Sequence, residues 1–146
     1  MYGPGSLDPN MRRRSVYFQI KRSQLIPIMN LFDAPDSLVG IGKRPSTTVA
    51  PQALALMNNA QVRAYAKGLA ARVRPMAKES PAESIRRAYR LALGRMPEPE
   101  ELIAGLDFLL AQSERYRAEN KADAFGLALE DACQSLMCLN EFIYIE

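Results

Sequence analysis

Apolar and polar residues follow a helical period over most of the second half of the chain. Over residues 59–74 and 81–93, apolar residues recur three or four positions apart, which places them on one face of a helix. The same spacing continues over residues 98–118 and then from about 123 to 140. With the short turns between them, these segments predict a mainly α fold, an antiparallel bundle of about four longer helices.

Capping residues mark the ends of these predicted helices. Asn58 or Asn59 is expected to cap the first helix, and Pro75 to stop it. The sequence SPAE at residues 80–83 is typical of a capping box with proline at the first helical position. Gly94 supplies the left-handed residue that ends the same helix. The helix boundaries therefore follow from local sequence.

The residues predicted to face the core share the helical spacing. They are Val62, Tyr65, Ala66, Leu69 and Val73; Ile85, Ala88, Tyr89, Ala92 and Leu93; Leu102, Leu106, Leu109, Ser113 and Tyr116; and Phe125, Leu129, Ala132, Cys133 and Leu136. Met29, Met57 and Met137 are predicted to fill the core rather than to ligate haem iron, because the CxxCH motif of c-type cytochromes is absent. The tail EFIYIE, residues 141–146, is expected to be extended.

The N-terminal third has a different pattern. Residues 1–11 are rich in glycine and proline and predict a loop. Alternating apolar residues over 15–21 predict one short extended segment, and residues 23–32 predict a short buried helix. The chain then stays irregular until Pro51, which is suited to open a helical run.

This pattern suggests a simple domain organisation. A leader at residues 1–11 precedes a single helical domain over 12–146, in which 12–58 form a basic irregular segment and 59–146 form the bundle. With 146 residues, 48% of them apolar, the chain is long enough to bury a core. No run approaches the ~18 to 20 apolar residues of a membrane span, and the start lacks the apolar centre of a signal peptide. The chain is expected to be soluble, with any export signal lying outside it.

Charge divides the chain more sharply than the net value of +3 indicates. Residues 1–78 carry 12 Lys or Arg and 3 Asp or Glu, whereas residues 79–146 carry 7 and 13. A basic face can bind an anionic ligand or partner, or the two halves can attract each other. Nucleic acid is the less favoured ligand, because no recognition helix or zinc-ligand spacing appears. The candidate anion-binding or partner-binding residues are Arg12, Arg13, Arg14, Lys21, Arg22, Lys43 and Arg44.

Residue types needed for common chemistries are missing. The chain has no histidine, which is the usual general base and the commonest metal ligand. Asp33 and Asp36 are too few carboxylates for a cation site and suit a turn instead. Cys133 and Cys138 are five positions apart, so on a helix they point to different faces and are predicted to be buried, unpaired thiols. The sequence predicts no catalytic residue, no metal site and no cofactor.

Several blocks together resemble one known family. RRSVYFQIKRS, LFDAPD, RPSTTVAPQALALMNN, AYRLALGRMPEPEEL and the closing NEFIYIE are similar to the planctomycete-specific C-terminal domain of unknown function 1553. The resemblance implies a domain that ends large exported proteins, which carry a second domain of unknown function and often a c-type cytochrome-like domain. The residues expected to form its structural signature are Asp33, Pro35, Asp36, Thr47, Thr48, Pro51 and Asn58.

The resemblance carries no catalytic residue over to this chain. We therefore expect a non-catalytic helical interaction or scaffold domain whose basic N-terminal third docks on another domain or protein. The alternative is part of a larger enzyme that binds an acidic or sulfated polysaccharide through the same arginines and lysines.

Overall fold

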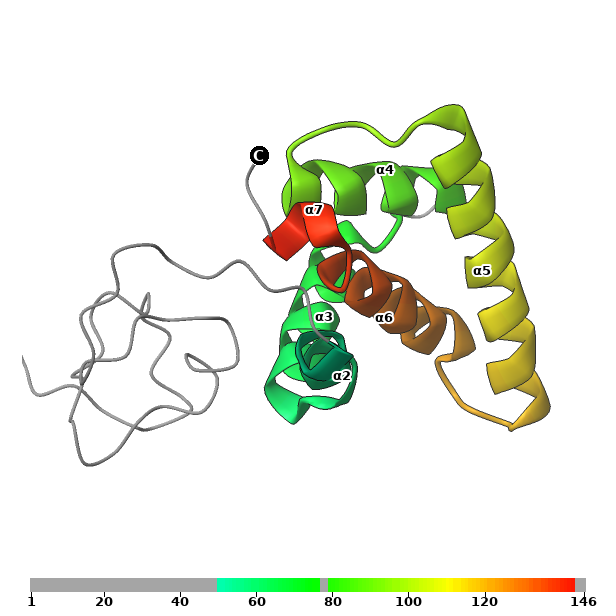
Figure 1. Ribbon diagram of the computed structural model, residues 1–146. Coiled ribbons are helices and arrows are strands. Elements are labelled where there is room, and N and C mark those ends of the chain that lie inside the picture. Colours follow the sequence, from blue (N-terminus) through cyan, green and yellow to red (C-terminus); the bar gives the residue numbers. More distant parts are fainter. Residues whose placement is uncertain (1–49, 77–78, 144–146) are drawn as a thin grey trace, which may run out of the picture. The chain divides into compact units, whose positions relative to one another are not determined.

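The computed structural model describes residues 50–76 and 79–143 (Figure 1). By its backbone contacts the chain divides into two units, Met1–Leu54 and Ala55–Glu146. The predicted leader at 1–11, the extended segment and the helix at 23–32 lie outside the described residues. The division into a leader and a single domain over 12–146 stays a prediction.

The described part of the chain is helical, which confirms the predicted mainly α fold. Four longer helices correspond to the predicted ones, and none of the described helices is long and apolar enough to cross a membrane. The helices are α2 (Ala50–Asn58), α3 (Ala60–Val73), α4 (Pro81–Leu93), α5 (Pro99–Ala118), α6 (Ala124–Met137) and α7 (Asn140–Ile143).

Local caps place the start of α3 and the end of α4. The Asn59 side chain accepts a hydrogen bond from the backbone N–H of Gln61 at 2.7 Å, whereas Asn58 is the last residue of α2. Of the two candidate caps, Asn59 is therefore the one used. Gly94 ends α4 with φ of 75°, and its N–H donates to the carbonyl oxygen of Arg90 at 3.2 Å. Both ends follow the sequence prediction.

The start of α4 corrects one detail of that prediction. Ser80 Oγ accepts a hydrogen bond from the N–H of Ala82 at 3.1 Å, as a capping serine should. The Glu83 carboxylate does not return a bond to the cap; it pairs with Arg86 on the next turn. A charged donor three positions along the helix competes well with the neutral backbone N–H of the cap. The serine half of the capping box forms and the glutamate half does not.

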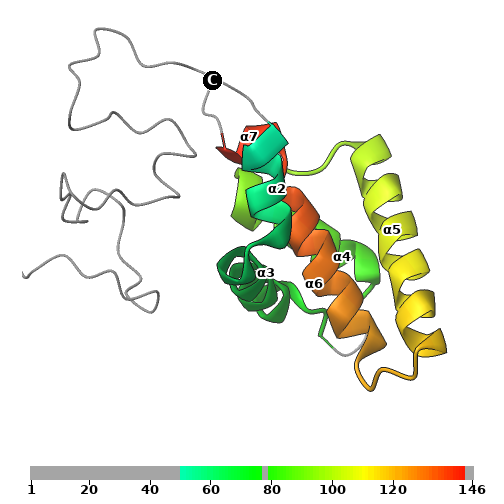
Figure 2. The same ribbon diagram turned by 60° about the horizontal axis from the view of Figure 1, so that its bottom comes forward.

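Helix α6 is the centre of the second unit. It packs against α3 and α5, and also contacts α4 and α7 (Figure 2). After α5 the chain turns, and α6 runs back along α5 in the opposite direction (Figure 1). Leu109, Leu129, Val73 and Cys133 are fully buried where these helices meet. The core residues of α3 to α6 are Val62, Ala66, Ala70, Val73, Ile85, Ala88, Tyr89, Leu109, Ala128, Leu129, Ala132, Cys133, Leu136 and Met137.

Two residues predicted to face the core are exposed. Tyr65 is 48% exposed, whereas Ala66, as predicted, and also Ala70 lie on the buried face of α3. Alanines let a helix approach its neighbour closely and leave no room for a phenol beside them. Met57 is 61% exposed, whereas Met137 is buried as predicted. Helical spacing identified the apolar face of each helix, but not which residues at the edge of that face are covered by a neighbouring helix.

The predicted extended tail is wrong for the part that is described. Asn140–Ile143 form the short helix α7, in which the N–H of Phe142 donates to the carbonyl oxygen of Leu139 at 3.0 Å. In addition, Arg95 binds the Glu141 carboxylate and anchors this turn. A pattern only a few residues long cannot separate a strand period from a helical turn.

Two glycines provide a matched test of backbone conformation. Gly94→Ala is expected to lower the free energy of unfolding by ~1–2 kcal/mol, because φ is 75° there and an added Cβ disfavours that conformation. Gly68→Ala, within the exposed part of α3, is expected to raise it by ~0.5–1 kcal/mol, since its Cβ would meet no atom within 4 Å. Urea denaturation of both variants measures the difference. Equal effects of the two substitutions would contradict the conformation assigned to Gly94.

Candidate interaction site

Most residues singled out from the sequence lie outside the described part of the chain. Their pairing and the anionic-ligand alternative therefore stay predictions. Pro51 and Asn58 are described: Pro51 lies in the first turn of α2 and Asn58 is the last residue of that helix. The residues outside are Arg12, Arg13, Arg14, Lys21, Arg22, Lys43, Arg44, Asp33, Pro35, Asp36, Thr47 and Thr48.

Asp131 on α6 connects three helices through its carboxylate. One oxygen accepts a hydrogen bond from the guanidinium of Arg63 on α3 at 2.5 Å. The other accepts from the hydroxyl of Tyr116 on α5 at 2.8 Å. This hydrogen bond, together with burial, raises the pKa of Tyr116 above its usual range. Because both oxygens have partners, Asp131 holds α3, α5 and α6 in a fixed relation.

Gln134, one turn after Asp131, joins the end of α2 to α6. Its amide nitrogen donates to the carbonyl oxygens of Met57 at 2.8 Å and Leu56 at 3.2 Å. Carbonyls in the last turn of a helix have no partner within the helix, so the glutamine supplies one. Its amide oxygen accepts from Arg63 at 3.1 Å, which links the two sets of contacts. The last turn of α2 is thus tied to the central helix.

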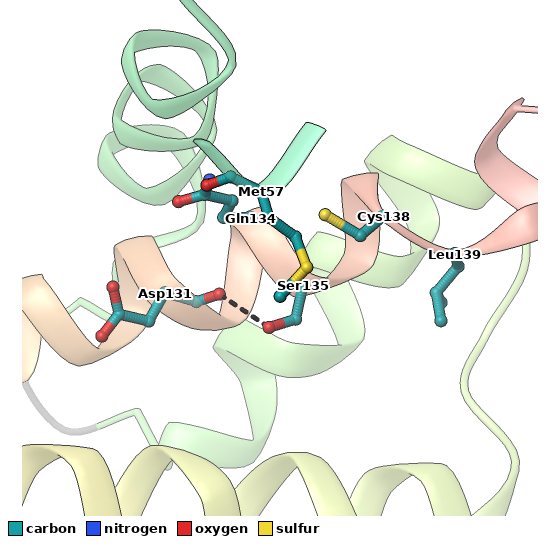
Figure 3. A pocket seen from close by; sticks show the side chains of 6 residues that line it. All are labelled: Met57, Asp131, Gln134, Ser135, Cys138 and Leu139. Atoms are coloured by element: carbon teal, nitrogen blue, oxygen red, sulfur yellow. Dashed lines mark hydrogen bonds between the residues drawn. The ribbon is translucent and has the colours of Figure 1, made fainter. Parts of the chain in front are cut away.

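A pocket of about 340 Å³ lies beside this network (Figure 3). Its polar wall comes from one face of α6, and its apolar wall comes from Met57 and from the residues after α6. Met57 lines the pocket and is 61% exposed. The lining residues are Met57, Asp131, Gln134, Ser135, Cys138 and Leu139. The site combines an apolar rim with hydrogen-bonding groups that are already fixed.

The lining groups are suited to binding rather than to reaction. The Ser135 hydroxyl donates its hydrogen bond to the backbone carbonyl of Asp131 at 3.0 Å. It therefore does not donate to a general base, which a nucleophilic serine requires. Burial raises the pKa of the Cys138 thiol, which disfavours the thiolate that a nucleophile needs. Burial also raises the pKa of Cys133, to about 12. Both cysteines are free thiols, as predicted, but only Cys133 is fully buried, whereas Cys138 is partly exposed.

A second charged cluster fixes α7, which follows directly on the pocket residue Leu139. Arg95 binds Glu101 through two hydrogen bonds of 2.7 and 2.8 Å and binds Glu141 through two of the same lengths. Its guanidinium also lies 5.5 Å from the ring centroid of Tyr89. The hydrogen bond from Arg95 lowers the pKa of Glu101 to about 2. This cluster ties the turn between α4 and α5 to α7.

Sequence reasoning missed Asp131, Gln134 and Ser135, although a signal was present. These polar residues occur at positions i, i+3 and i+4 of a segment in which Glu130 is the other charged residue, and Cys138 follows at i+7. That spacing places all four on one face of the helix. A polar row on a helix that is apolar elsewhere indicates a site or a buried network.

Among the residues that the structure describes, no group of three or more His, Cys, Asp or Glu side chains is placed to hold a metal ion. Comparison with known families gives one match: the family described as "Protein of unknown function (DUF1553)" matches residues 5–109. No curated protein and no solved structure shows a significant match. The matched residues run from the N-terminal segment into α5, and the helix that carries Asp131 and Gln134 follows them.

Proposed function

We propose, on the premise that this chain belongs to the family of proteins of unknown function described as DUF1553, that it is a non-catalytic helical interaction domain. In this proposal its pocket, lined by the end of α2, by α6 and by the residues directly after α6, receives a side chain of another domain or protein. The second domain and the cytochrome-like domain implied by the sequence resemblance are the first partners to consider.

The observation that carries this proposal is that Met57 is exposed although the helix end that bears it is held in place by Gln134. A methionine that is 61% exposed leaves apolar surface in water, and its polarizable, unbranched side chain adapts to many partner shapes. The backbone that carries it is held by Gln134. A partner that covers Met57 would gain apolar burial without having to order the surface first. Leu139 extends the same apolar rim.

The polar residues of α6 that line the pocket would orient the bound side chain. Asp131 and Gln134 already bind groups on α2, α3 and α5, so they offer only their remaining hydrogen-bonding capacity to an incoming chain. Small sets of fixed polar groups in a mainly apolar pocket orient a ligand. We therefore expect the occupant to be a large apolar side chain flanked by a polar backbone or side-chain group.

Peptide selection on the full chain tests this function. A phage-displayed random peptide library is panned on the immobilised protein, with Met57→Glu as counter-selection. We expect enriched peptides to contain a large apolar residue, and their affinity, measured by fluorescence anisotropy, to fall at least about tenfold on Met57→Glu. Bound peptide should also slow the reaction of Cys138 with a maleimide, since that thiol lines the pocket.

Met76→Glu is the matched control, because Met76 is also strongly exposed, at 71%, but does not line the pocket. It should leave the affinity of the selected peptides unchanged. Circular dichroism of both variants should show the same helix content as the unmodified chain. Failure to enrich any sequence against Met57→Glu, or equal loss of affinity in both variants, would refute the function.

A further inference from the structure

The outer face of α5 is distinct from the pocket. Helix α5 packs against α4 and α6, and both views show the other described helices on one side of it only (Figures 1 and 2). Leu109 and Ser113 face inward and are buried. Ile103 and Leu110 lie about a quarter turn around the helix from these buried residues and are 60% and 54% exposed. This 20-residue helix thus presents exposed apolar side chains beside its buried face.

Two rows of side chains run along this outer face. Ile103 and Leu110 are seven positions apart, and so are Glu100, Asp107 and Glu114. Seven residues make almost two helical turns, so each row follows the helix axis with a repeat of about 10 Å. Asp107 follows Ile103 by four positions, and therefore the acidic row lies directly beside the apolar row.

The acidic row is unpaired within the described part of the chain. Glu100, Asp107 and Glu114 are exposed and form no ion pair with any described residue. Other acidic residues of this unit do have partners, such as Glu101 with Arg95 and Asp123 with Arg74. The outer face of α5 therefore combines exposed apolar surface with uncompensated negative charge.

The geometry points to a basic amphipathic helix as the occupant of this face. A seven-residue repeat on one helix matches apolar side chains at the same repeat on a second helix, packed side by side as in a coiled coil. Lysine or arginine beside the partner's apolar row would meet the acidic row of α5. Such flanking charges decide which partner binds and in which orientation.

A second copy of this chain fits the face less well. Pairing α5 with α5 would bring two acidic rows together, and like charges beside an interface disfavour it. The acidic row therefore disfavours self-association while it attracts a basic helix. This surface lies apart from the pocket and does not depend on the proposed function of the pocket.

Binding of two designed helices to the full chain tests the inference. Both are synthetic peptides of three heptads with Ile at position a and Leu at position d; one has Lys at e and g, the other Glu. We expect the Lys peptide to bind at low salt and the Glu peptide to bind at least about tenfold more weakly, as measured by fluorescence anisotropy. High salt should weaken the Lys peptide more than the Glu peptide.

Variants of α5 assign the binding to this face. Leu110→Ala and Asp107→Lys should each weaken the Lys peptide at least about tenfold, whereas Met57→Glu at the pocket should have no effect. If the Lys peptide fails to bind, or binds Leu110→Ala as tightly as the unmodified chain, the inference is wrong. Self-association in sedimentation experiments that Leu110→Ala abolishes would overturn it in favour of a second copy.

Discussion

Leu109→Ala is expected to lower the free energy of unfolding by ~2–5 kcal/mol, the largest effect we expect from a single substitution in this domain. Leu109 is fully buried where α5 meets the core cluster. Removing its outer carbons loses their burial and leaves a cavity that close-packed neighbours fill only in part. Urea denaturation followed by circular dichroism measures the change as a lower midpoint.

Leu110→Ala is the matched control, because the same residue type one position along lies on the exposed face of α5. It is expected to change the free energy of unfolding by no more than ~0.5 kcal/mol. Similar losses for the two variants would mean that α5 does not face the core as described. The same variant leaves the fold intact for the peptide-binding test on the outer face.

Asp131→Ala is expected to cost ~1–3 kcal/mol, since it removes an acceptor from both Arg63 and Tyr116. Donors in a partly buried site that lose their partner pay part of the cost of desolvation, because water reaches them only incompletely. Tyr116→Phe removes only one of the two hydrogen bonds and should cost ~0.5–1.5 kcal/mol. Thermal and urea denaturation of the three proteins measures these differences.

The double variant separates a network from independent contacts. If Asp131 organises Tyr116, the loss in Asp131→Ala combined with Tyr116→Phe will be smaller than the sum of the single losses. Additive losses, or a loss below ~0.5 kcal/mol for Asp131→Ala, would contradict the role of this carboxylate in joining three helices. The result also bears on the pocket, because Asp131 and Gln134 form its polar wall.

The two proposed interaction surfaces differ in their chemistry. The pocket presents Met57 above a fixed polar wall, whereas the outer face of α5 presents Ile103 and Leu110 beside an acidic row. Their chemistry differs, so they suit different partners and respond to different variants. A protein that used both would bring two partners to one small helical unit, as a scaffold does.

The sequence by itself determined the helical class and most helix ends. Asn59, Ser80 and Gly94 form hydrogen bonds with backbone groups a few residues away. The helix ends that they mark can therefore be predicted from the local sequence. Helical periodicity also identified most of the buried residues, among them Leu109 and Leu129. These predictions succeeded because each depends on residues within one or two turns of each other.

Only the tertiary structure decided which apolar and polar side chains found partners. Tyr65 and Met57 were predicted to be buried, yet both are exposed, because burial depends on which neighbouring helix covers a given face. Asp131 meets Arg63 and Tyr116 across three helices, with 68 positions separating it from Arg63. Periodicity along one helix contains no information on such distant pairs. The packing of α3, α5 and α6 brings them together, and with them the pocket.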